Sequence, residues 1–322
     1  MARRLALLVL VVFGLAIGGY YAWSWWQGPP EQAQRPPEEK KIEPAPAPPA
    51  IVTGLKELLQ RELVGAFAVA PDQGLHGVFP WQPLLHLADN NGFTLENLLE
   101  SNPLRFLELC AERYDREVHS YNLLFVKKER VKGKLHPPDD KYEKIQVAFR
   151  EKPSFGVLFV WKENPRNKLA AKALYVEGEN KNKIVGKGKL PIILEYDLNS
   201  AEARNNGRYT MAEFGLGKAM HRTVRAMQKA KEKDTLHVRY EGRVALKELD
   251  DRPCYKFVRT PYTPPEDDDG VYELIIYIDC ETWLQVGSIL HDSDGNLLAE
   301  YYFRDIELNP EFTPKQFTKA GL

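Results

Sequence analysis

The sequence predicts an α+β protein in which an antiparallel β-sheet is covered by helices and a single transmembrane helix precedes the folded part. Three observations support this prediction. Residues Leu5 to Trp26 run for 22 residues without a charge. The spacing of apolar residues changes from helical to alternating after Glu117. One amphipathic helix, Met211 to Lys231, interrupts the strands, so helices and strands do not alternate as in a parallel α/β fold.

The uncharged run at the N-terminus predicts a membrane anchor. A helix rises ~1.5 Å per residue, so this run is long enough to cross a hydrocarbon core of ~30 Å. Arg3 and Arg4 precede the run and the next basic residue is Arg35, which places residues 1–4 in the cytoplasm. A cleaved secretory signal is the alternative, but its apolar region is shorter and ends in small residues. We therefore expect an uncleaved single-pass anchor in the inner membrane, with the folded part in the periplasm or outside the cell.

The segment after the anchor has the composition of a spacer. Residues 27–50 hold eight of the 23 prolines of the chain, and proline-rich segments favour an extended polyproline II conformation. We expect a helical preface over residues 51–100 and a domain of strands and helices over residues 101–322. The formal net charge of −1 gives no field that attracts nucleic acid, so no nucleic-acid partner is expected.

No catalytic signature is found in the sequence, which contains no H-E-x-x-H, no G-x-S-x-G and no P-loop spacing. Asp292 and Asp294 offer oxygens in HDSDGN, but a calcium loop also needs a later bidentate Glu. Asp294 and Gly295 between two strands instead predict a hairpin turn. We therefore expect no enzyme activity, no cofactor and no metal site.

A capped helix opens the domain. Asn102 is a capping residue and Pro103 suits the first helical position. We expect Cys110 to be a buried core thiol, because a catalytic cysteine would need a neighbouring base and an electropositive setting. The apolar residues that share one face of this helix are Leu104, Leu107, Cys110, Ala111 and Tyr114.

Eleven short segments, rich in β-branched and aromatic residues and separated by Gly, Pro, Asn and Asp, read as strands. Within SFGVLFVWK, from Ser154 to Lys162, both alternating sets of side chains are apolar. Such a strand needs cover on both faces, or one face that bounds an apolar cavity. The predicted strands are Val118 to Glu129, Lys141 to Arg150, Ser154 to Lys162, Leu169 to Gly178, Lys183 to Lys187, Leu190 to Asp197, Thr235 to Glu248, Cys254 to Thr260, Val271 to Cys280, Leu284 to Asp292 and Leu297 to Leu308.

The helix that interrupts the strands has two distinct faces. Thr210 and Glu213 form a capping box ahead of it, and an apolar stripe follows at helical spacing. The opposite face carries a basic strip, which is either an ordinary solvated face or a site for anionic lipid headgroups or a partner. The stripe consists of Leu216, Met220, Val224 and Met227, and the basic strip of Lys218, Arg222, Arg225 and Lys229.

Two of the three cysteines are expected to form a disulfide. If Cys254 to Thr260 pairs with Val271 to Cys280 so that Thr260 opposes Leu274, then Cys254 opposes Cys280. Directly opposed residues lie ~4.5–5.5 Å apart at Cα, which overlaps the distance range of disulfides. This register predicts a bridge between Cys254 and Cys280.

Six phrases of the sequence are informative together: FVKKERVKGKL from Phe125, FREKPSFGVLFVW from Phe149, ALYVEGENKNKI from Ala173, DDRPCYKF from Asp250, IYIDCETWLQVGSI from Ile276 and EYYFRDIELNPEFTPKQF from Glu300. They resemble a bacterial domain-of-unknown-function family of membrane-anchored exported proteins. Their order is similar, more distantly, to the outer-membrane lipoprotein carrier (lipoprotein-sorting) superfamily.

The resemblance implies a strongly curved antiparallel sheet, a half-barrel covered by helices, with a cavity for acyl chains. It supplies no catalytic residue, and a soluble carrier would differ from a chain tethered by its N-terminus. We expect a tethered, non-catalytic binding module for a membrane lipid or lipoprotein acyl chain. The alternative is an envelope protein-interaction or regulatory module whose cavity is filled by its own side chains. The expected wall residues are Phe125, Phe155, Val157, Phe159, Trp161, Met220, Met227 and Trp283.

Overall fold

The computed structural model describes residues 37–42, 95–138, 141–165, 169–189, 192–204, 207–262 and 270–322. The predicted anchor, residues 5–26, and most of the predicted preface, residues 51–100, lie outside these ranges. Within the described ranges, no helix is both long enough and apolar enough to cross a membrane. The anchor therefore stays a prediction.

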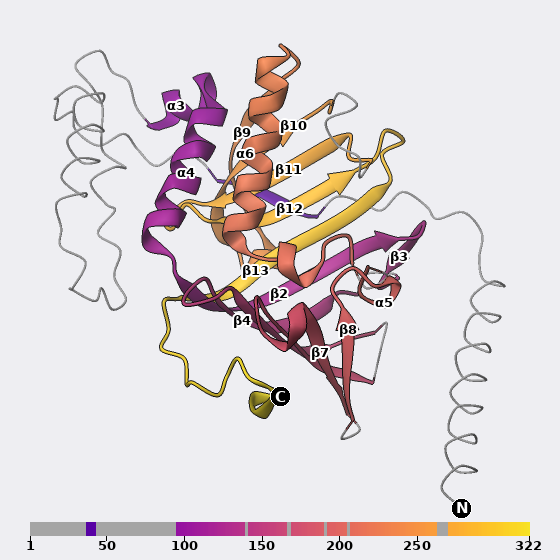
Figure 1. The fold of residues 1–322 in the computed structure, drawn as a ribbon. Helices are drawn as coiled ribbons and strands as arrows, with labels where there is room; N and C mark the ends of the chain where they lie inside the picture. The colour runs from indigo at the N-terminus through magenta and orange to yellow at the C-terminus, as the bar shows by residue number, and fades with distance from the viewer. Residues whose placement is uncertain are drawn as a thin grey trace, which may run out of the picture. The chain divides into compact units, whose positions relative to one another are not determined.

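A 13-stranded antiparallel sheet forms the centre of the described domain (Figure 1). Its strands follow the order β1-β9-β10-β11-β12-β13-β2-β4-β5-β6-β7-β8, with the short β3 paired to β2, and the sheet is not closed. Every predicted strand corresponds to an observed one, which confirms the α+β class. The strands are β1 (Glu39–Lys41), β2 (Ser120–Val131), β3 (Lys134–His136), β4 (Glu143–Arg150), β5 (Gly156–Glu163), β6 (Ala170–Val176), β7 (Lys183–Gly188), β8 (Ile193–Asp197), β9 (Val238–Leu246), β10 (Arg252–Arg259), β11 (Glu273–Asp279), β12 (Gln285–His291) and β13 (Leu297–Leu308).

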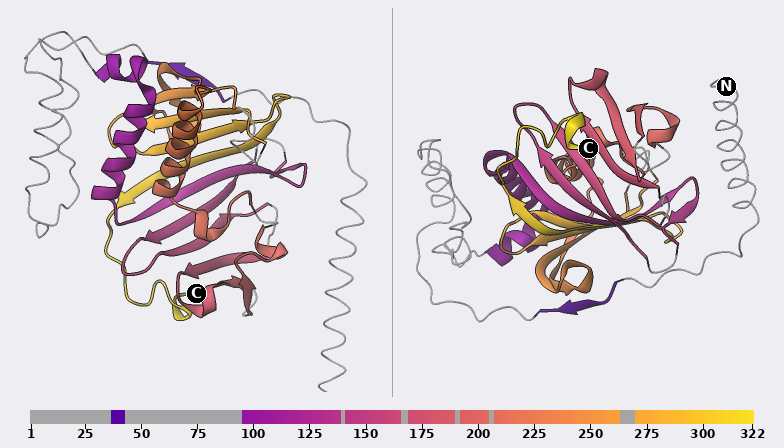
Figure 2. Two further views of the ribbon diagram at one scale, coloured as in Figure 1. Left: turned by 45° about the horizontal axis from the view of Figure 1, so that its top comes forward. Right: turned by 90° about the horizontal axis from the view of Figure 1, so that it is seen from below.

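Helices cover one face of this sheet, which we call the helix face. Figure 2 shows α4 and α6 side by side across it, and a short α3 precedes α4. The ring of Phe106 in α4 lies 5.7 Å from those of Tyr255 and Phe257 in β10. The helices are α3 (Leu95–Ser101), α4 (Pro103–Glu117), α5 (Ala201–Arg204) and α6 (Leu216–Glu232).

The predicted helix starts are confirmed in one case and shifted in the other. The Asn102 side chain accepts a hydrogen bond from the Arg105 N–H at 3.2 Å, so it caps α4. The Thr210 and Glu213 box also forms, with the Thr210 N–H donating to Glu213 Oε2 at 2.8 Å. It closes the 3₁₀ turn η3 (Met211–Glu213), however, and α6 begins only at Leu216. Gly215, with φ 142°, separates the two because few other residues adopt that backbone angle.

The sheet itself anchors the start of α6. The backbone N–H of Leu216 donates a hydrogen bond to the Tyr121 hydroxyl of β2 at 3.0 Å. The first N–H groups of a helix have no partner within it, so this bond satisfies one of them in the core. Burial raises the pKa of Tyr121 well above its ordinary value, which keeps the hydroxyl neutral.

Part of the predicted spacer is a strand. Residues Glu39–Lys41 form β1, which pairs with the end of β9. In this pair Glu39 lies opposite Leu246. The Glu39 carboxylate accepts from Lys256 Nζ at 2.7 Å and from the Tyr277 hydroxyl at 2.5 Å. Proline content cannot reveal such a contact, because the partners lie more than 200 residues away in the sequence.

The C-terminal segment covers the other face of the sheet. Phe317 and Leu322 pack there in a second apolar cluster with side chains of β4, β5, β6 and β7. Asn309, where this segment starts, accepts from the His119 N–H at 2.8 Å and donates to the Glu117 carbonyl at 2.8 Å. Residues 309–322 therefore tie the end of α4 and cover strands whose outer faces are apolar.

The predicted disulfide is wrong. The hairpin of β10 and β11 pairs Cys254 with Asp279, one residue away from the predicted register, and all three cysteines are free. Because side chains alternate between faces, a slip of one residue moves Cys280 to the face opposite Cys254. Asp279 fixes this register, since its carboxylate caps the following turn and pairs with Arg252 Nη1 at 3.3 Å.

We expect Gly217→Ala to destabilise the domain. A Cβ at Gly217 would lie 2.1 Å from Cε1 of Tyr114, so α4 and α6 could no longer pack at their observed separation. Such overpacking should lower the free energy of unfolding by about 1–3 kcal/mol, measured by urea unfolding of the full chain in detergent. Gly186→Ala is the control, because its nearest neighbour would lie at 3.5 Å. Equal stability of the two variants would contradict this account of the packing.

We expect three free thiols that react only after unfolding. All three cysteines are buried, and burial raises the pKa of the Cys280 thiol to about 11 and those of Cys110 and Cys254 further. Iodoacetamide should therefore add three groups to the denatured chain without reductant, and far fewer to the native chain, by intact mass. If the denatured chain gains all three groups only after prior reduction, a disulfide is present and this prediction is wrong.

Candidate functional site

Four phenylalanines from distant segments meet on the helix face, and we call them the aromatic cluster. Phe125, Phe159 and Phe303 come from β2, β5 and β13, and Phe214 comes from the link between η3 and α6. The Phe214 ring lies 4.9 Å from Phe159, 5.2 Å from Phe125 and 6.2 Å from Phe303. The three sheet residues are buried, whereas Phe214 is half-buried. Phe214 thus closes an apolar surface that the sheet provides.

Most of the predicted wall residues lie in the core around this cluster. Seven are buried, and Trp161 is half-buried and packs against the same core. Phe155 lies in the same core, with its ring 5.9 Å from Tyr175 and 5.3 Å from Phe149. The buried wall residues are Phe125, Phe155, Val157, Phe159, Met220, Met227 and Trp283.

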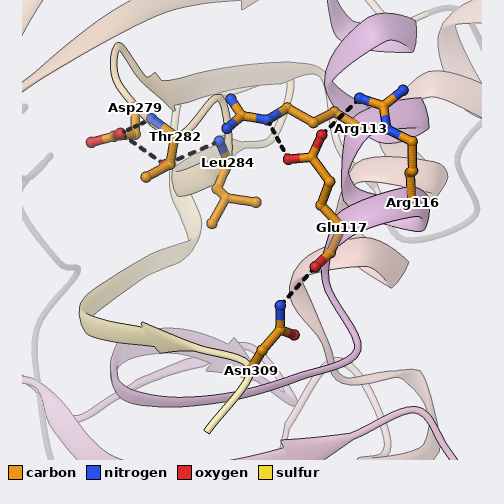
Figure 3. Close-up of polar contacts among 7 residues, drawn as sticks. All are labelled: Arg113, Arg116, Glu117, Asp279, Thr282, Leu284 and Asn309. Atoms are coloured by element: carbon orange, nitrogen blue, oxygen red, sulfur yellow. Dashed lines mark hydrogen bonds and ion pairs between the residues drawn. The ribbon is translucent and has the colours of Figure 1, made fainter. Parts of the chain in front are cut away.

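Trp283 belongs to a different contact region. Its ring lies 5.2 Å from Phe106 of α4 and 5.9 Å from the guanidinium carbon of Arg113. Figure 3 shows polar contacts of Arg113 and Glu117 in α4, and of Asp279 and Thr282 at the turn between β11 and β12. Arg113 Nε pairs with Glu117 at 3.0 Å, and Asp279 accepts the N–H and hydroxyl of Thr282 at 2.6 and 2.8 Å. Trp283 therefore fastens α4 to the turn between β11 and β12.

A buried ionic cluster lies beyond Phe125 on the same alternating face of β2. Lys127 Nζ pairs with Glu129 Oε2 at 2.8 Å and lies 3.7 Å from Glu143 Oε2. The Tyr301 hydroxyl donates to Glu129 Oε1 at 2.7 Å, and Trp161 Nε1 donates to Glu143. Each carboxylate therefore has two partners, which is how buried charges are tolerated. This arrangement orders the end of the helix face instead of presenting a reactive group.

The predicted basic strip is divided between two environments. Lys218 Nζ lies 3.6 Å from the Phe155 ring centroid and donates to the Ala212 carbonyl at 2.5 Å. Burial lowers the pKa of Lys218, and the nearby Glu151 opposes that effect. Arg222 lies over the Tyr209 ring at 3.9 Å, whereas Arg225 and Lys229 are exposed. Only the second half of the strip faces solvent fully.

The family profile of DUF1571, described as a protein of unknown function, matches residues 118–321. The chain belongs to the DUF1571 family. The matched region spans β2 to β13 and α6, so it includes the whole aromatic cluster and the ionic cluster. No curated protein is significantly similar to the sequence.

Solved structures with similar folds share little sequence with this DUF1571 protein. A crystal structure of MucB has 15% identity and a TM-score of 0.40, and the match covers 68% of this chain and 63% of that one. The Pseudomonas aeruginosa MucA/MucB complex has 15% identity and a TM-score of 0.39, over 68% and 61%. A LolA superfamily protein from Nitrosomonas europaea has 10% identity and a TM-score of 0.30, over 67% and 99%. Similarities at this level carry no inference about function.

The DUF1571 chain shows no metal-binding group in the part that the structure describes. There, no three or more His, Cys, Asp or Glu side chains come together in a way that could hold an ion. The Asp292 carboxylate has its hydrogen-bond partners within its own turn. It accepts hydrogen bonds from the N–H groups of Asp294 and Asn296 at 3.0 and 2.8 Å. The absence of enzyme activity stays a prediction.

Sequence reasoning missed Phe214 and the ionic cluster. Phe214 lies in a link whose position depends on the fold, so no periodicity marks it. Lys127 and Lys128 are consecutive charged residues, which are usually exposed, yet both are buried. The alternation of side chains along β2 could have indicated that Lys127 and Glu129 are buried. They continue the inward-facing series of Tyr121, Leu123 and Phe125.

We expect the ionic cluster to behave as a coupled unit. Lys127→Met would leave Glu129 and Glu143 buried without their shared cation and should cost about 3 kcal/mol in unfolding free energy. Adding Glu129→Gln removes one of the two uncompensated charges, so the double variant should recover part of the loss. Chemical unfolding of the wild-type chain, Lys127→Met, Glu129→Gln and the double variant measures the coupling. Simply additive losses would show that the two side chains do not interact.

Proposed function

We propose that this protein is a non-catalytic envelope binding module that takes an acyl chain of a lipid or lipoprotein between its sheet and α6. The aromatic cluster carries the proposal, because its sheet half is an apolar surface and its other half is a single half-buried side chain, Phe214. An acyl chain would occupy the position of that ring. The sheet then acts as a half-barrel with α6 as its cover.

The link that carries Phe214 favours exchange between a state in which its ring closes the aromatic cluster and a state in which an acyl chain takes the place of the ring. Phe214 follows the 3₁₀ turn η3 and precedes Gly215, so no regular helix holds its backbone. The start of α6 is fixed separately by Tyr121, which would keep the helix in place when Phe214 leaves. Displacing one half-buried ring costs far less than separating α6 from the sheet.

The place of action is part of the proposal. With the predicted anchor at residues 5–26, the module would work on lipids near one membrane. Lipid capture or sensing there fits a tethered chain better than transport between membranes.

A second candidate is an envelope protein-interaction or regulatory module that binds no lipid. The observation in its favour is that the predicted wall residues already pack against one another and against α6. In that case Phe214 is a permanent part of the core, and a partner binds the outside of the domain.

We expect Phe214→Ala to increase acyl-chain binding. The full chain in nanodiscs would be photolysed with a diazirine-bearing fatty acid, and adducts mapped by mass spectrometry. Removing the ring should raise the yield on peptides that contain Phe125, Phe159 or Phe303 by about tenfold, since the ligand no longer displaces it. Phe312→Ala is the matched control, because Phe312 is also half-buried but packs on the Phe317 cluster of the other face. No adduct on these peptides in either variant would favour the second candidate.

A further inference from the structure

Four aliphatic side chains are exposed together at one corner of the sheet, which we call the apolar corner. They are Leu169 at 60% exposure, Ile192 at 50%, Ile193 at 47% and Leu194 at 51%. Exposed large aliphatic residues are common singly, but a group of four in neighbouring positions marks an interaction surface. The corner belongs to none of the clusters described above.

Strand pairing brings these residues together. Ile193 opposes Lys187 and Leu194 opposes Gly186 in the pair of β7 and β8. The Lys189 N–H donates to the Leu169 carbonyl at 2.9 Å, which places Leu169 beside the end of β7. Among the described residues β8 is the last strand of the sheet, so the corner also lies at a sheet edge. Figure 1 shows β7 and β8 at the bottom of the sheet.

The apolar surface extends over both faces of the sheet at this corner. Ile193 and Leu194 are consecutive in β8, so their side chains point to opposite faces, and both are about half exposed. A strand added to the β8 edge would cover the edge but leave one side of each residue open to water. The acyl chains of a bilayer are fluid and can cover both faces of the corner at once.

The charges beside the corner are positive. Lys189 directly follows β7, and Lys162 lies at the same end of the sheet in β5. Lys187, the residue before the last of β7, already donates to the Leu322 carbonyl at 2.8 Å. Carboxylates nearby are neutralised within the protein, since Glu163 pairs with Lys144 at 3.0 Å and Glu195 pairs with Lys319 at 2.5 Å. Aliphatic residues flanked by lysines match the boundary of an anionic bilayer, where acyl chains lie beneath phosphate groups.

We propose that the apolar corner is a membrane-docking site that inserts into the surface of an anionic bilayer. Leu169, Ile192, Ile193 and Leu194 enter the region between headgroups and acyl chains, while Lys162 and Lys189 contact lipid phosphates. The segment between the predicted anchor and β1 spans about 12 residues and can reach ~37 Å, which allows the domain to turn toward the bilayer. This docking does not depend on whether the aromatic cluster binds an acyl chain.

The experiment uses the full chain, one per nanodisc, with an environment-sensitive fluorophore on Leu194→Cys or Ile192→Cys. The native cysteines are buried, so the introduced thiol is labelled selectively. Discs contain phosphatidylcholine alone or with phosphatidylglycerol, and a nitroxide on some lipid tails quenches fluorophores that enter the bilayer. Tyr272→Cys is the control position, because Tyr272 is exposed at 42% and lies next to β11, away from the corner.

We expect tail nitroxides to quench the label at positions 194 and 192 in phosphatidylglycerol discs, and to quench it weakly in phosphatidylcholine discs and at position 272. Lys162→Glu with Lys189→Glu should reduce the docked fraction about tenfold or more, because each lysine near an anionic surface contributes ~1 kcal/mol. Equal quenching at positions 194 and 272 in both disc types would overturn the proposal. A second preparation holds two chains per disc. A change in emission at positions 192 and 194 that occurs only in those discs, and that tail nitroxides do not quench, would also overturn the proposal and would assign the corner to a second copy.

Discussion

The burial of both faces of one long open sheet is the constraint on which the rest of this structure depends. Strands such as β5 are apolar on both sides, so each side needs its own cover. Helices α4 and α6 cover one face, and the C-terminal segment covers β4 to β7 on the other. The sheet does not close on itself, so helices must pack on one of its faces and the C-terminal segment on the other.

Several polar groups are buried along with these faces, and some of their hydrogen bonds also fix the position of an element. Tyr121 holds the first turn of α6, Asp279 sets the register of β10 and β11, and Asn309 ties the end of α4 to the last segment. The cluster of Lys127, Glu129 and Glu143 orders the end of the helix face in the same way. These bonds decide alignment more than they add stability, since an intramolecular hydrogen bond contributes only about 1 kcal/mol net.

The proposed functions use surfaces that this packing leaves incomplete. On the helix face, a single half-buried ring closes the aromatic cluster. At the far end of the sheet, β8 is the last strand among the described residues, with β7 on one side only, and it leaves aliphatic side chains in water. Both surfaces are apolar and both suit lipid, one as a site for a single chain and the other as a contact with the bilayer. A tethered domain would bring the two into reach of the same membrane.

The sequence by itself determined the class of fold, the strands and the capped start of α4, because alternation, helical spacing and capping residues act over a few neighbouring positions. It also marked buried side chains of the strands such as Phe125, Val157 and Phe159, since inward-facing positions follow from the period of each strand. Only the tertiary structure decided the free cysteines, the docking of Glu39–Lys41 and the place of Phe214. Each depends on contacts between distant segments: a hairpin register differing by one residue, an edge strand joined across more than 200 residues, and a link held between strands. Local pattern carries no information about such contacts, because their energies appear only when the sheet is assembled.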